Sequence, residues 1–153
     1  MTKKSQYNYI IGFPENVILL FILLIALTIK GFFLANANPL PDEAYYWLWS
    51  KNIALSFFDH PPLATWTQAF LHTFSGNKYF VIRALPVFCL GCVLAIMIVW
   101  QIYMSQRFHY HVCLRSIVLF LVFPIYAIFF SISFPDYLLI TLLFASSFCL
   151  FLY

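Results

Sequence analysis

Four apolar runs, separated by short polar segments, decide what this chain can fold into. They span residues 17–35, 79–104, 116–134 and 137–153. We interpret each run as one crossing of a membrane, whose hydrocarbon core is about 30 Å thick. Inside a bilayer the backbone must satisfy its own hydrogen bonds, which favours helices over open sheets. The sequence therefore predicts an all-α polytopic membrane protein with about four transmembrane helices in a single domain, residues 1–153.

The composition supports the same class of protein. Charged residues make up 8% of the 153 residues and apolar residues 64%, whereas roughly 25% of a typical soluble domain is charged. The net charge of +3 is spread along the chain without a basic run. This distribution argues against a nucleic-acid-binding surface.

The segment 41–78 is the one long stretch that is not continuously apolar. Residues 42–50 predict a short helix, and its aromatic residues suit the headgroup level of a membrane. Two prolines begin a second helical stretch over about 61–74, because proline is tolerated in the first turn of a helix. We expect two interfacial helices that lie along the membrane surface within this outer loop.

The first apolar run is expected to stay in the protein. It is long and lacks a small-x-small cleavage site, which argues against a cleaved signal peptide. Lys30 lies near its far end, where a long side chain can reach the headgroups. Basic residues are equally numerous on the two sides of the predicted membrane, so charge alone leaves the orientation open, with a slight preference for a cytoplasmic N-terminus. In either orientation the loop 41–78 and Asp136 share one side.

The few carboxylates are the first candidates for chemistry, because an ionisable group at membrane depth is costly. Asp42 and Glu43 are adjacent and would point about 100° apart on a helix. We therefore expect one of them to face a site and the other to pack or cap, with a solvated helix start as the alternative. Asp136 stands alone between two apolar runs. It can serve a site, cap the following helix, or do both.

Two further features could bind an anion or a metal. Asp59 and His60 precede Pro61-Pro62, and such a rigid corner could present a metal ligand or a phosphate contact. The alternative is a plain turn. Arg83 lies near the start of the second apolar run, where a guanidinium and a helix end would together attract an anion. The alternative is a cation that reaches the membrane surface.

These features follow one another in a recognisable order: Asp-Glu-Ala-Tyr-Tyr-Trp at 42–47, Asp-His-Pro-Pro-Leu at 59–63, Gly-Asn at 76–77 with Arg83, and Phe-Pro-Asp at 134–136. The ordered set resembles the N-terminal part of GT-C glycosyltransferases. The resemblance is to the dolichyl-phosphate-mannose protein mannosyltransferase superfamily and its bacterial relatives, which include the lipid A aminoarabinose transferases. Each motif alone is weak, whereas the ordered set is specific and covers essentially the whole chain.

The resemblance implies a reaction and a place. A sugar would pass from a polyprenyl-phosphate donor to a lipid, glycan or protein acceptor, with inversion, on the outer face of a bacterial inner membrane. Asp42 matches the first-loop catalytic aspartate, with Glu43 beside it, and would act as general base on the acceptor hydroxyl or orient it. Asp136 matches the second acidic site of the family.

The same resemblance assigns residues to the donor phosphate and to a metal ion. Asp59 falls where aminoarabinose transferases have an acidic residue linked to a divalent metal, which is the one cofactor implied. His60 falls where they carry a lysine that contacts the lipid phosphate. Because histidine is only partly charged near neutral pH, Arg83 is expected to supply the missing charge.

The length departs from the family, whose members have about a dozen crossings. We therefore expect an N-terminal fragment that is inactive alone, with later helices supplied by further sequence or by a partner chain. The expected binding partners are membrane lipid and the sugar donor, and no nucleic acid. A non-catalytic remnant or accessory subunit is the alternative. A small transporter is disfavoured because the charges fall at helix ends rather than within helices.

Overall fold

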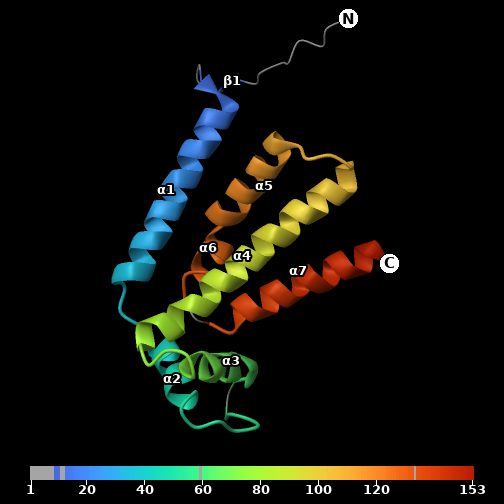
Figure 1. Ribbon diagram of the computed structural model, residues 1–153. Helices are drawn as coiled ribbons and strands as arrows, with labels where there is room; N and C mark the ends of the chain where they lie inside the picture. Colours follow the sequence, from blue (N-terminus) through green and yellow to red (C-terminus); the bar gives the residue numbers. More distant parts are fainter. Residues whose placement is uncertain (1–8, 11–12, 59, 133) are drawn as a thin grey trace, which may run out of the picture.

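The computed structural model describes residues 9–10, 13–58, 60–132 and 134–153, and these form seven helices and one short strand pair (Figure 1). The predicted all-α class is confirmed, apart from the two-residue antiparallel pair. The elements are β1 (Tyr9–Ile10), β2 (Phe13–Pro14), α1 (Glu15–Asn36), α2 (Pro41–Trp49), α3 (Leu63–His72), α4 (Lys78–Ser105), α5 (Tyr110–Val122), α6 (Pro124–Phe129) and α7 (Asp136–Leu152).

Two of the described helices are long and apolar enough to cross a membrane: α1, with 22 residues, and the 27-residue stretch Tyr79–Ser105 of α4. Helix α1 leaves most of its apolar surface uncovered, and Phe32 is 70% exposed. A bare apolar helix of this kind fits a bilayer rather than water. Helices α5 and α7 are apolar but shorter, so helix length alone marks two candidate crossings, and the predicted count of four is not confirmed.

The third predicted crossing, residues 116–134, is not one helix. Helix α5 begins earlier, at Tyr110, and the helical path is interrupted at Phe123, whose ψ of 121° is extended. Pro124 then occupies the first position of α6. Proline lacks the N–H that would continue the helix, and it pushes the residue before it towards extended geometry. The segment expected to form the third crossing is therefore divided between two helices, and the crossing itself stays a prediction.

The two short helices expected in residues 41–78 are α2 and α3. Helix α3 is shorter than predicted, since it begins at Leu63 and ends at His72. The two helices pack against each other and against α4. Figure 1 shows them together at one end of the molecule, next to the first turns of α4. This end also receives the connection between α6 and α7, so it gathers most of the predicted site residues.

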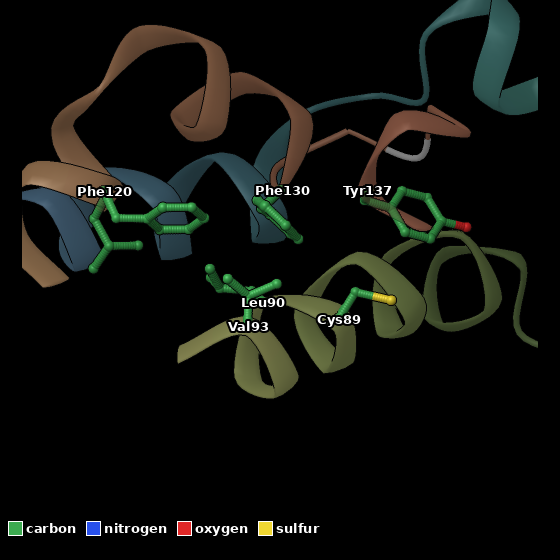
Figure 2. Close-up of a cluster of buried hydrophobic side chains, with 7 residues drawn as sticks. Cys89, Leu90, Val93, Phe120, Phe130 and Tyr137 are labelled. Carbon is green, nitrogen blue, oxygen red and sulfur yellow. The ribbon is translucent and has the colours of Figure 1, made fainter. Parts of the chain in front are cut away.

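The buried core joins α4 to α5 and α7 (Figure 2). Its members are aliphatic, aromatic and thiol side chains: Cys89, Leu90, Val93, Phe120, Leu121, Phe130 and Tyr137. The Phe120 ring stacks on Tyr126 at 4.4 Å between ring centres and meets Phe144 edge-on at 5.7 Å. Helix α1 packs mainly on α5, and it stands apart from α7 in Figure 1.

Asn77 caps the start of α4. Its Oδ1 accepts hydrogen bonds from the backbone N–H groups of Tyr79, at 3.0 Å, and Phe80, at 3.3 Å. We expect Asn77→Ala to lower the free energy of unfolding by about 1 kcal/mol, because these N–H groups lose their acceptor. Asn77→Asp should retain the cap. Unfolding of the chain in detergent measures both variants, and equal stability of the alanine variant would contradict the capping role.

Candidate functional site

A buried ion pair between Glu43 and Arg83 lies at the centre of the end formed by α2, α3 and the start of α4. Glu43 is fully buried in the first turn of α2, and its Oε2 accepts the Leu40 N–H at 2.9 Å. Its Oε1 pairs with Nη1 of Arg83. Arg83 also donates to the backbone oxygens of Ser131, at 3.0 Å, and Ala37, at 3.5 Å. One guanidinium thus joins α4, α2, the α1–α2 connection and the α6–α7 connection.

Asp42 and Glu43 occupy different environments, as their adjacent positions on a helix require. Glu43 is the residue that packs and caps, whereas Asp42 is exposed. Among the residues that the structure describes, Asp42 forms no ion pair. Its carboxylate is therefore the one of the two that solvent can reach.

His60 lies in the connection that leads to α3. Its ring is half-buried, with its centre 5.3 Å from that of Tyr46 and 6.1 Å from that of Trp49. Trp49 in turn stacks on Phe57 at 4.6 Å. These ring contacts hold the connection against α2 and place His60 at the same end of the molecule as the ion pair.

The predicted metal ligand, Asp59, lies outside the described residues. Within the described ranges, no three His, Cys, Asp or Glu side chains gather closely enough to hold a metal ion. The divalent metal therefore stays a prediction from the sequence.

Asp136 is the first residue of α7 and borders a cavity of about 320 Å³. The cavity lies between the start of α3 and the first turns of α7, and the rest of its lining is apolar: Pro61, Leu63, Ala64, Pro135, Leu138, Leu139 and Leu142. Pro135 holds the cap position of α7, and no side chain caps this helix. The capping interpretation of Asp136 is therefore not confirmed, although a negative charge in the first turn still suits the helix dipole.

The side chain of Lys30 does not lie where the sequence predicted. It does not reach out to the membrane surface, because the residue is only 8% exposed. Its Nζ donates to the backbone oxygen of Ala127 at 2.9 Å and to Oγ of Ser131 at 2.6 Å. The short helix α6 ends here, and the last carbonyls of a helix have no partner within it. Lys30 supplies a donor to one of them.

The sequence did not point to Ser131, which touches both buried cations through different atoms. Its role depends on the break after Phe123, which brings the α6–α7 connection up against α1 and α4. A lysine within an apolar run did indicate a polar contact in this part of the chain. It could not identify Ser131 as the partner of Lys30.

A separate polar contact lies far from these residues, between the start of α1 and α5. Arg115 donates from Nε and Nη2 to the two carboxylate oxygens of Glu15, both at 2.5 Å. His111 contacts Asn16 at 2.6 Å. Figure 1 places the start of α1 at the opposite end from α2 and α3, so Glu15 offers a control for charge changes at the candidate site.

The comparison with curated proteins finds one partial similarity. The lipid A galacturonosyltransferase RgtD of Rhizobium johnstonii is 36% identical over 58 residues. The chain is similar to part of a glycosyltransferase. This match covers 37% of the chain and 12% of that relative, so the chain spans a small part of the relative's length. No family model and no solved structure matches the chain.

The similarity is consistent with a GT-C-type glycosyltransferase, and the apolar helices α1 and α4 are consistent with a membrane protein. At 58 residues the match does not establish a family. Donor, acceptor and membrane topology are therefore matters of proposal.

Proposed function

We propose that this chain contributes part of the outer-face active site of a membrane glycosyltransferase of the GT-C type. The enzyme would transfer a sugar from a polyprenyl-phosphate donor to a lipid, glycan or protein acceptor, with inversion. The observation that carries the proposal is the Asp136 carboxylate at the edge of an apolar cavity, next to Pro61 in the motif that contains His60. The partial similarity to a lipid A glycosyltransferase supports the same reaction class.

Asp42 takes the role of general base in this proposal. It is an exposed carboxylate without an ion-pair partner among the described residues, so it can accept the proton of an acceptor hydroxyl. Asp136 acts beside the apolar cavity, where its negative charge can orient the acceptor or stabilise positive charge that develops on the sugar. The lining of the cavity is apolar apart from Asp136, and electrostatic interactions are stronger in such surroundings than in solvent.

The donor is a phosphodiester and the group that leaves is polyprenyl phosphate, so the site mainly needs a base and positive charge near the phosphate. Arg83 is committed to Glu43 through Nη1, but its buried Nε has no hydrogen-bond partner among the described residues. That donor, together with His60, is the proposed contact to the donor phosphate. The bacterial inner membrane is the proposed location, and helices from further sequence or from a partner chain would complete the enclosure.

Sugar transfer tests the proposal in membranes that contain the protein with its natural partners. Radiolabelled polyprenyl-phosphate galacturonic acid is the first donor, since the relative's name specifies that sugar, and the aminoarabinose donor is the second. We expect Asp42→Asn and Asp136→Asn each to lower the transfer rate by about 100-fold or more, because each removes a carboxylate from the reaction. Glu15→Gln, a matched charge change at the opposite end, should leave the rate unchanged.

The outcomes separate the alternatives. Full transfer by Asp42→Asn would remove Asp42 from the role of base. Transfer that does not change when the whole chain is deleted would favour a non-catalytic remnant. Transfer that needs the chain but tolerates both substitutions would favour an accessory subunit.

A further inference from the structure

An apolar groove in the described part of the chain contains a buried lysine. A cavity of about 480 Å³ lies between α1 and the α5–α6 segment, with Lys30 and Ser131 in its lining. Its other walls are aliphatic or aromatic, and include Ile25, Ile29 and Phe33 from α1. Ile128 and Ile132 face them from the other side. A cation is thus placed in a groove that otherwise suits a hydrocarbon chain.

The charges around Ser131 do not balance. Lys30 contacts Oγ of Ser131 at 2.6 Å, and Arg83 contacts its backbone oxygen at 3.0 Å, so two buried cations meet at one residue. Glu43 pairs with Arg83. Among the described residues Lys30 has only neutral partners, the oxygens of Ala127 and Ser131. An unpaired charge that is buried away from water is costly, and at membrane depth it marks a functional site.

Hydrogen-bond donors also remain available here. An ammonium group carries three N–H donors, and two of those on Lys30 are used. The Nε donor of Arg83 is buried without a partner in the described part of the chain. The guanidinium lies 5.7 Å from the centre of the Phe33 ring, and Phe33 lines the groove. The missing component is therefore an acceptor that carries negative charge.

Lys30 lies near the end of α1. It precedes Asn36, the last residue of α1, by six positions, which is about 9 Å along a helix. That end of α1 leads directly into α2. A lipid that entered from this end could place its headgroup at Lys30 and its chain along α1.

We propose that Lys30 binds the phosphate of a membrane lipid whose hydrocarbon chain lies in the groove between α1 and the α5–α6 segment. Charge and shape together favour this occupant. A packed apolar helix would cover the groove but leave the charge unpaired, and free phosphate would pair the charge but leave the apolar walls empty. The inference requires only a lipid phosphate at Lys30 and not sugar transfer, although the Arg83 Nε donor, which the proposed function assigns to the donor phosphate, lies close to the same groove.

Lipid binding to the whole chain in maltoside detergent, which carries no phosphate, tests the inference. The probe is a polyprenyl phosphate with a photoreactive group on its chain. We expect Lys30→Met to weaken binding by about tenfold or more, the loss expected for one charge-assisted hydrogen bond. Lys30→Arg should retain most of the affinity. Lys51→Met removes an exposed lysine that lies over the Trp47 ring, outside the groove, and should have no effect.

Binding measurements with other ligands identify the lipid. Polyprenol has the same chain without the phosphate and should bind much more weakly, and inorganic phosphate should not displace the probe. Phosphatidylglycerol binding tighter than the polyprenyl phosphate would support the site and name a diacyl lipid as its source. Equal binding of polyprenol, or displacement by inorganic phosphate alone, would overturn the inference.

Mapping the photoproducts keeps the inference testable even if Lys30→Met does not fold. In the wild-type chain the probe should label residues within 22–33 and 121–132, which contribute the lining of the groove. Labelling confined to other segments would overturn the inference. Loss of sugar transfer in Asp42→Asn has no bearing on these measurements, so failure of the proposed function and failure of this inference are distinguishable.

Discussion

Glu43→Gln is expected to lower the free energy of unfolding by about 3–5 kcal/mol, the cost of leaving a buried charge without its partner. Glu43 is fully buried and Arg83 is only 7% exposed, so water cannot replace the lost carboxylate. The same carboxylate also accepts the Leu40 N–H at the start of α2. Unfolding in detergent micelles, followed by circular dichroism, measures the loss.

Two further variants identify the cause. Asp42→Asn makes the same chemical change on the exposed neighbour and should alter stability by less than about 0.5 kcal/mol. The double variant Glu43→Gln/Arg83→Met should be more stable than Glu43→Gln alone, because it removes the orphaned charge. A double variant that is no more stable than the single one would show that the ion pair is not the origin of the effect.

Phe130→Ala is expected to cost about 3–5 kcal/mol, the usual loss when a buried phenylalanine is truncated in a core. Phe130 is completely buried where the α6–α7 connection meets α4, and its ring centre lies 5.8 Å from that of Phe120 (Figure 2). The cavity left behind should loosen the contact of α7 with α4. Cys89 belongs to the same cluster and is 3% exposed, so its reaction with a thiol reagent should become faster.

Phe88→Ala provides the matched control for the core. Phe88 precedes Cys89 on α4 but is 67% exposed, so its truncation opens no cavity in the cluster. The stability of the Phe88→Ala variant and the reactivity of its Cys89 should stay close to those of the wild type. Unchanged reactivity of Cys89 in Phe130→Ala would contradict the role of Phe130 in holding α7 to α4.

The elements that the sequence predicted well depend on local signals. The first long helix and α4 both follow from long apolar runs, residues 17–35 and 79–104. The break at Pro124 shows where local signals fail. Pro86 lies inside α4 without ending it, whereas Pro124 begins a new helix after an extended residue. Both prolines occur in apolar runs, so the difference depends on packing that the sequence does not display.

The candidate site was predictable to a similar degree. Local helix geometry predicted that Asp42 and Glu43 would differ, and Glu43 is the one that packs. The partner of Glu43 is 40 residues away, and the contact of Lys30 with Ser131 joins positions 101 apart. Such pairings depend on how α1, α2, α4 and the α6–α7 connection meet. Composition and periodicity do not contain that information.

The contact between Lys30 and the end of α6 sets an order of events during synthesis. Ribosomes add about 5–20 residues each second, so Ser131 follows Asn36 by roughly 5–20 s. Until then the ammonium group has neither of its two described acceptors, Ala127 and Ser131. If the first helix enters a membrane, Lys30 would stay hydrated until then, because a charged group without acceptors is costly in hydrocarbon. Its contacts with Ala127 and Ser131 can form only after the α6 segment has been made.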